Sequence, residues 1–169
     1  MPPIDLERLY DEHASALFAF VLNSTRHESD TRDVLQELFI KLARHPELLR
    51  DVRELRGFLL RLSHNLAVDF IRRRATRDRN HEQLAEQFVN VFAANAEPDE
   101  QAFQQALAVA LGELPEDQRA VVHLKLWEHL TFERIAEILD IPLNTAASRF
   151  RYGLDKLRHR LRPLYEEIK

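Results

Sequence analysis

LTFERIAEILDIPLNTAASRFRYGLDKLRHRL, residues Leu130–Leu161, is the stretch of this sequence that decides the fold. Thr131 has the hydroxyl of a good N-cap, and the apolar residues after it recur at the spacing of a short helix. The segment Asp140–Leu143 predicts a tight turn, after which a new helix begins at Asn144 or Thr145. Two helices joined by so short a turn are typical of the DNA-binding helix-turn-helix, whose second helix enters the major groove.

The second helix of this motif has a polar face that suits DNA. Base-edge contacts specify sequence and phosphate contacts position the helix. The candidates for these contacts are Asn144, Thr145, Ser148, Arg149, Arg151 and Tyr152, and the basic residues Lys156, Arg158, Arg160 and Arg162 follow them. We expect the helix to end before Pro163. An ordinary helical hairpin with a solvated basic face is the alternative.

The rest of the chain also predicts helices. Only 3 of the 169 residues are Gly and 45% are hydrophobic, a mixture that favours an all-α fold. In the first half of the chain, helical periodicity extends over about residues 5–22, from the N-cap candidates Ser29-Asp30 to His45-Pro46, and over about 54–74. In the second half it extends over about 98–111, where Gly112 is a plausible stop, and from Pro115 to Trp127. Residues 82–118 contain eight acidic residues and no Lys or Arg. We therefore expect two small helical domains, 1–78 and 101–169, joined by an acidic linker, 79–100, with one short helix near 84–92.

Composition argues against several other classes of protein. There is no cysteine, and the eight His residues show no metal-ligand spacing, so we expect no metal and no cofactor. No catalytic constellation is evident, and we expect neither an enzyme nor a small-molecule substrate. The first residues are not a signal peptide, and no stretch has the roughly 20 apolar residues of a membrane span. The sequence predicts a cytoplasmic protein without membrane insertion.

The helix-turn-helix and the helix before it resemble region 4 of the extracytoplasmic-function sigma factors of bacterial RNA polymerase. The matching residues are Leu114-Pro115, Arg119, Ile135-Ala136-Glu137, Ile141-Pro142 and Thr145-Ala146-Ala147-Ser148-Arg149. The resemblance implies that this unit reads the −35 promoter element and docks on the β-flap of the polymerase. Three residues depart from the family pattern: His129 and Asp140 replace Gly, and Ala147 replaces a frequent Lys or Arg. Two roles are open for the apolar stretch before the helix-turn-helix: it docks on the flap, it packs in the core, or its residues divide between the two. This stretch consists of Val121, Val122, Leu124, Leu126 and Trp127.

An independent match lies near the start of the chain. Asp33–Phe39 resembles region 2.2, which binds the clamp helices of the β′ subunit. The residues that the resemblance assigns to polymerase binding are Asp33, Gln36, Glu37, Phe39 and Lys41. Apart from Phe39 these are spaced three or four apart and share one helical face. A plain solvated face is the alternative.

Leu59–Arg77 resembles regions 2.3 to 2.4, which open and read the −10 element. The −10 candidates are Arg61, Asn65, Asp69, Arg72 and Arg73, with Arg74, Arg77 and Arg79 extending the basic end. Asn65 and Asp69 could instead hold the domain together by hydrogen bonds. The resemblance places the residues that capture an unpaired base in the loop His45–Arg53.

Taken together, the two matches imply a sigma factor. Its partners would be core RNA polymerase (the β and β′ subunits), promoter DNA and, as is common in this family, an anti-sigma factor. One rival is a stand-alone helix-turn-helix regulator that binds operator DNA. The other is a helical adaptor, or sequestered partner, without promoter activity.

Overall fold

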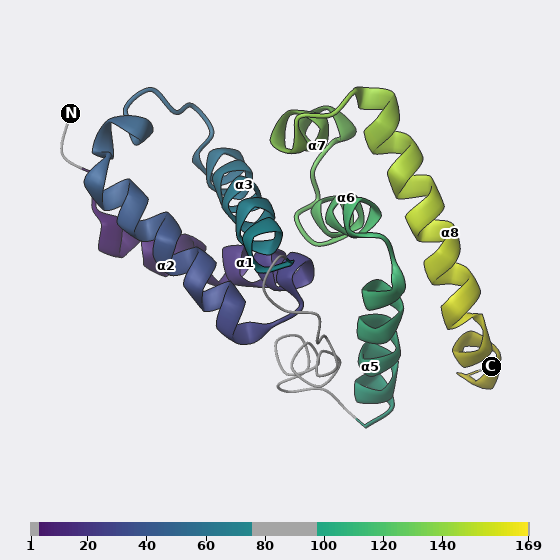
Figure 1. Cartoon of the computed structure of the whole chain (residues 1–169). Helices are drawn as coiled ribbons and strands as arrows, with labels where there is room; N and C mark the ends of the chain where they lie inside the picture. The colour runs from purple at the N-terminus through teal and green to yellow at the C-terminus, as the bar shows by residue number, and fades with distance from the viewer. Residues whose placement is uncertain (1–3, 76–97, 169) are drawn as a thin grey trace. The chain divides into compact units, whose positions relative to one another are not determined.

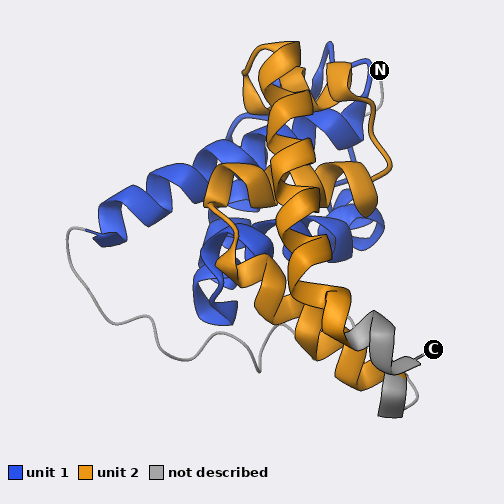
Figure 2. Ribbon diagram, turned by 90° about the vertical axis from the view of Figure 1, so that its right-hand side faces the viewer, with its two compact units in different colours: residues 1–80 blue, residues 81–169 orange. Residues whose placement is uncertain are grey.

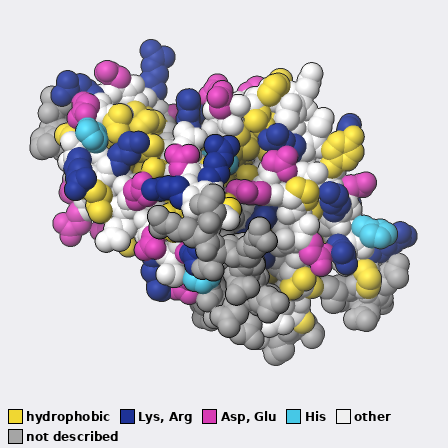
Figure 3. Space-filling model, viewed as in Figure 1, with side chains coloured by type: hydrophobic (Ala, Val, Ile, Leu, Met, Phe, Trp, Pro, Cys, Tyr) yellow, Lys and Arg dark blue, Asp and Glu magenta, His cyan; other side chains and the backbone are white. Residues whose placement is uncertain are grey.

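A computed structural model of the chain describes residues 4–75 and 98–168. These residues form helices that divide into two compact units, residues 1–80 and 81–169 (Figures 1 and 2). The expected linker 79–100 and the short helix near 84–92 lie almost entirely outside the described residues. On the face shown in Figure 3, Lys and Arg side chains lie interspersed with Asp and Glu.

Unit 1 is a bundle of three α-helices: α1 (Leu6–Thr25), α2 (Glu28–Arg44) and α3 (Leu55–Ala75). A short 3-10 helix, η1 (Pro46–Leu49), follows α2 and was not expected from the sequence. Each long helix contributes one apolar stripe to a shared core, which removes apolar surface from water. The core includes Leu17, Phe20, Val21, Leu22, Val34, Leu38, Leu42, Leu59, Leu60 and Ala67.

The start of α2 differs from the expectation. Helix α2 begins at Glu28 rather than after an N-cap at Ser29 or Asp30, and its N-cap His27 makes no side-chain cap hydrogen bond. The preceding Arg26 has a left-handed backbone, with φ 59°, which turns the chain sharply out of α1. Asp30 is buried and forms an ion pair with Arg74 of α3, so this carboxylate makes a tertiary contact instead of capping its own helix.

Unit 2 contains α5 (Pro98–Glu113), α6 (Glu116–Leu126), α7 (Phe132–Leu139) and α8 (Leu143–Ile168). Two expected helix ends were wrong. Helix α5 continues through Gly112 to Glu113, and α8 continues through Pro163 to Ile168. A proline inside a helix removes one backbone hydrogen bond, and this loss does not end α8.

Helices α6 and α8 approach closely at Gly153. Gly153 is buried, and a Cβ atom built on it would lie 2.8 Å from Cγ2 of Val122, which is fully buried in α6. Val122 is β-branched and therefore has little rotamer freedom in a helix. The absence of a side chain at residue 153 thus permits the crossing that carries α8 over the core of unit 2.

His123 of α6 is also part of this core. It is 2% exposed and stacks on Trp127, with 5.4 Å between the ring centroids. Burial lowers the pKa of His123 to about 4, from the ordinary 6.5. Protonation of this imidazole therefore opposes folding of unit 2.

We expect Gly153→Ala to lower the free energy of unfolding of unit 2 by about 1 kcal/mol. Overpacking of the added methyl group against Val122 costs about 1–3 kcal/mol. This cost exceeds the roughly 1 kcal/mol by which Ala is more favourable than Gly in a helix. Urea unfolding followed by the fluorescence of Trp127, the single tryptophan, measures this change. The control Gly112→Ala, at an exposed position of α5, should leave stability unchanged or raise it. Stabilisation by Gly153→Ala would show that Val122 moves aside without cost.

Unit 2 should lose stability as the pH falls from about 6.5 to about 4, by up to about 3 kcal/mol from His123. The sign follows from the lowered pKa, because the unfolded chain takes up the proton at a higher pH than the folded one. In His123→Phe, which retains a ring beside Trp127, this part of the pH dependence should disappear. Unfolding curves at pH 7 and pH 5 for both proteins measure the difference, and an equal loss in both would assign it to the carboxylates instead.

Candidate nucleic-acid and partner interfaces

The turn between α7 and α8 is held by local hydrogen bonds. The Thr131 hydroxyl accepts a hydrogen bond from the backbone N–H of Arg134 (3.2 Å), so Thr131 is the N-cap of α7 as expected. Asp140 has a left-handed backbone, with φ 54°, and the Ile141 N–H donates to the carbonyl of Ala136 (3.0 Å). This turn directs the chain into α8, which begins at Leu143, one residue before the expected start.

The first turns of α8 present an exposed face. Asn144 and Arg151 are exposed, Ser148 is half-buried beside them, and the Tyr152 side chain is 55% exposed. These residues recur at helical spacing on one side of α8. The guanidinium of Arg151 lies 5.2 Å from the ring centre of Tyr152, a cation–π distance. Four of the six predicted −35 residues therefore share one surface.

The other two predicted −35 residues, Thr145 and Arg149, are half-buried at the flank of this face. Arg149 Nε lies 3.4 Å from a carboxylate oxygen of Asp117, at the start of α6, so it ties α8 to the rest of unit 2. Leu143 was missed by the sequence analysis. It is 45% exposed at the very start of α8, and an apolar residue preceding a DNA-reading Asn was the available signal.

In unit 1, four of the predicted polymerase-binding residues share the expected face of α2. Asp33, Gln36 and Lys41 are exposed, and Glu37 is partly exposed. Ile40, which the sequence analysis missed, lies between them at helical spacing and is 44% exposed. An apolar side chain within a polar stripe was the signal for a partner contact.

Phe39 lies away from this face. Its ring packs edge-on against Tyr10 of α1, with 5.1 Å between centroids, and is half-buried. The structure therefore does not bring Phe39 together with the four polar residues of α2. Its contact with the polymerase remains a prediction.

The predicted −10 residues lie along α3. Arg61, Asn65, Asp69 and Arg72 are all exposed at helical spacing. Neither Asn65 nor Asp69 makes a side-chain hydrogen bond to another helix within the described part of the chain, which weighs against their holding the unit together. Arg73 donates to Glu37 of α2 (3.5 Å), so a predicted −10 residue and a predicted polymerase-binding residue meet in one ion pair. Arg77 and Arg79 lie outside the described residues.

The loop His45–Arg53, where base capture is expected, is anchored through η1. Leu49 is buried, whereas Leu48 is exposed and His45 contacts Glu47 (3.1 Å). No cluster of three His, Asp or Glu residues able to hold a metal ion occurs among the described residues. No helix in the part of the chain described here is long and apolar enough to cross a membrane.

Comparison with known proteins matches both units. Residues 9–77 match Sigma-70 region 2, and residues 110–159 match Sigma-70, region 4. The ECF RNA polymerase sigma factor SigL of Mycobacterium tuberculosis is 30% identical over 161 residues, which cover 94% of this chain and 90% of SigL. The chain belongs to the extracytoplasmic-function (ECF) sigma factors. As a member of this family it directs promoter-specific transcription by RNA polymerase, and the stand-alone regulator is not favoured.

Other relatives of this ECF sigma factor span most of its length. The ECF RNA polymerase sigma-E factor of Haemophilus influenzae is 30% identical over 83% of this chain and 80% of the relative. The sigma factor RpoE of Bartonella quintana, solved in complex with the anti-sigma factor NepR, has a TM-score of 0.72. It is 20% identical and the match covers 92% of this chain and 96% of RpoE, so this likeness shows the fold.

We expect Arg151→Gln and Arg149→Gln to affect DNA binding differently. Arg151 is free to reach a phosphate, so its loss should lower the slope of log Kobs against log salt by about 1 for holoenzyme on promoter DNA. Arg149 is held by Asp117, so Arg149→Gln should leave the slope nearly unchanged and lower the stability of unit 2 by at most about 1 kcal/mol. A slope that falls equally in both variants would contradict this distinction.

Proposed function

We propose that the two units of this sigma factor act at two places on one promoter. Unit 2, with proposed bounds 101–169, reads the −35 element through α8. The exposed face at the start of α8 carries this proposal, because Asn144, Ser148, Arg151 and Tyr152 lie within the first turns after the turn at Asp140. A helix oriented in this way can insert its first turns between the phosphate strands of the major groove. Thr145 flanks it and contacts a phosphate, and Arg149, held by Asp117, positions the start of α8 for this contact.

Unit 1, with proposed bounds 1–78, binds the β′ clamp and opens the −10 element. The α2 face of Asp33, Gln36, Glu37 and Lys41, with Ile40 at its centre, is the polymerase surface, and Phe39 supports it from the side of α1. An exposed apolar residue ringed by polar ones is the usual composition of a protein interface.

The exposed edge of α3 supplies the DNA contacts of unit 1. Arg61, Asn65, Asp69 and Arg72 lie along it, and the basic end at Arg73 adds attraction to phosphates.

Three further parts of the proposal concern partners and location. The protein is a non-catalytic, cytoplasmic subunit that acts together with core RNA polymerase. Val121, Val122 and Leu124 are buried, whereas Leu126 is 42% exposed, so of this apolar stretch Leu126 is free to contact the β-flap. The Bartonella quintana relative is bound to an anti-sigma factor, and we extend that kind of partner to this chain.

Transcription with core RNA polymerase from a library of randomised promoters tests the assignment. Asn144→Ala and Tyr152→Ala should weaken selection at the −35 element by about tenfold per lost base contact and leave −10 selection unchanged. Asn65→Ala should do the reverse. Glu37→Lys should lower affinity for the core enzyme, because it reverses a charge on the polymerase surface of α2.

The control is Arg8→Ala, a change at an exposed residue of α1 whose side chain forms a surface ion pair with Glu12. It should leave promoter selection intact. No promoter-dependent transcription by the unaltered chain, together with tight duplex binding in the absence of polymerase, would instead favour the operator-binding regulator. Pull-down of the full chain, scored for β, β′ and a small helical protein, tests the partners.

A further inference from the structure

Helix α8 begins with an exposed leucine, Leu143, whose side chain is 45% exposed. The N–H groups of Thr145 and Ala146 both donate to the carbonyl of Pro142 (3.0 and 3.1 Å). The first turn of α8 therefore closes around Leu143, which fixes where this side chain leaves the helix. An exposed leucine is common on protein surfaces and by itself indicates no function. Leu143 differs because the first residues of a DNA-reading helix are those that reach base edges.

Ala147 lies beside Leu143, one turn further along α8, and is half-buried. Residues four apart on a helix are neighbours, with about 5–6 Å between their Cβ atoms. We call Leu143 and Ala147 the apolar strip of α8. The polar residues Asn144 and Ser148 each follow a residue of this strip by one position, about 100° around the helix. The apolar strip therefore runs along the edge of the polar face that we propose to read DNA.

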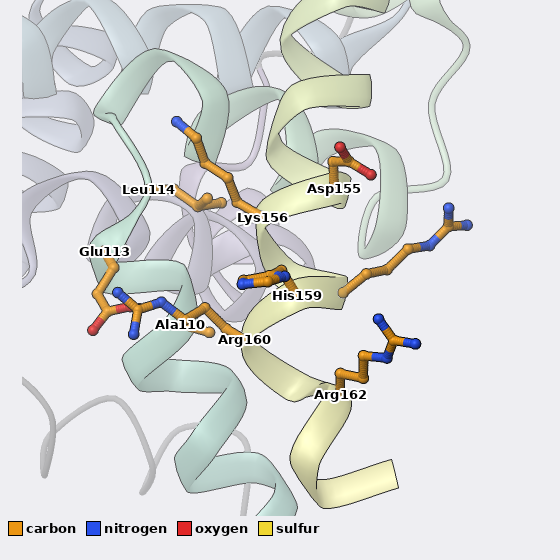
Figure 4. A pocket seen from close by; sticks show the side chains of 9 residues that line it. Ala110, Glu113, Leu114, Asp155, Lys156, His159, Arg160 and Arg162 are labelled. Carbon is orange, nitrogen blue, oxygen red and sulfur yellow. The ribbon is translucent and has the colours of Figure 1, made fainter. Parts of the chain in front are cut away.

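The second half of α8 has a different surface. Its exposed side chains over residues 155–162 are carboxylate, ammonium, guanidinium or imidazole groups. A pocket between this half of α8 and α5 is lined mainly by charged side chains, and Figure 4 shows Arg160 extending toward Glu113, whose carboxylate it contacts (2.9 Å). Within the part of α8 whose side chains are described, exposed large apolar residues therefore occur only in the first turns, at Leu143 and Tyr152.

The chemistry of the apolar strip restricts what it can recognise in DNA. The side chains of Leu143 and Ala147 have no hydrogen-bond donor or acceptor, so they cannot pair with the polar edge of a base or with a phosphate. Thymine alone among the four bases presents a methyl group in the major groove, and contact with an apolar side chain recognises it. The 5-methyl group of thymine is therefore the feature of the major groove that this strip fits.

We propose that the apolar strip of α8 selects thymine in the −35 element by packing against its 5-methyl group. This role rests on the proposed function, because it requires the first turns of α8 to lie in the major groove of that element. Asn144 and Ser148 then contact polar base edges beside the strip. Leu143 adds a preference for thymine that no hydrogen bond supplies.

Replacement of thymine by deoxyuridine tests this role, because deoxyuridine pairs in the same way and lacks only the methyl group. The −35 element is first identified by selection from randomised promoters with the holoenzyme, and each of its thymines, on either strand, is then replaced in turn. Holoenzyme with the unaltered chain should lose affinity by about fourfold at one or more of these thymines, the factor expected for burial of one methyl group. In Leu143→Ala the same replacement should lower affinity by less than about twofold.

The matched control is Val109→Ala, which shortens an apolar side chain of α5 that is 46% exposed, about as much as Leu143. It should retain the full effect of deoxyuridine. The measurement on the unaltered chain needs no variant, so it remains decisive even if Leu143→Ala lowers the stability of unit 2.

Four results would overturn this role of Leu143 and leave the reading of the −35 element by α8 intact. They are a selected −35 element without any A·T pair, no loss of affinity at any thymine, an equal loss in the unaltered chain and in Leu143→Ala, and weaker binding of Leu143→Ala to core polymerase with the deoxyuridine effect unchanged. The last result would make Leu143 a polymerase contact. Absence of any selection at the −35 element would instead overturn the proposed function itself.

Discussion

In unit 2, the direction of α8 is set where the chain passes through Asp140 with a left-handed backbone. Most residues avoid this region because Cβ crowds the following carbonyl, and Asp tolerates it better than most. The turn is then closed by the hydrogen bond from Ile141 to Ala136, which leaves little freedom between α7 and α8. The face of α8 that we propose to read the −35 element is oriented by this turn, so the proposed function depends on a backbone conformation as much as on the side chains of α8.

Unit 1 differs from unit 2 because its three-helix bundle carries two proposed surfaces, one on α2 for the polymerase and one on α3 for DNA. The apolar stripe of α2 packs on α1 and α3, and its polar stripe stays outside for a partner. The ion pair between buried Asp30 and the partly exposed Arg74 ties the start of α2 to the end of α3. Glu37 and Arg73 also meet across these helices, so the proposed polymerase surface of α2 is joined to the basic end of α3.

The sequence predicted local structure correctly where a residue interacts with others only a few positions away. The N-cap at Thr131 and the turn at Asp140 were predicted because a hydroxyl cap and a tolerated left-handed residue act within a few positions. The role of Asp30 was wrong because its partner, Arg74, is distant in sequence. The prediction that α8 ends before Pro163 was wrong, because propensity is a weak guide to where a long helix ends. The ion pair between Asp117 and Arg149 likewise arises only from packing, and no periodicity reveals it.

Because α8 crosses α6 closely at Gly153, a small tilt of α8 about this contact displaces its N-terminal end. Gly153 lies nine residues after Asn144, so the reading end extends about 14 Å beyond the contact with Val122. A tilt of about 5° about the Gly153–Val122 contact would displace Asn144 by about 1 Å. This displacement is enough to lengthen a hydrogen bond beyond the donor–acceptor distance at which it is effective. If Asn144 reads the −35 element as proposed, promoter choice depends partly on the buried Val122 methyl group of α6, which limits how α8 can tilt.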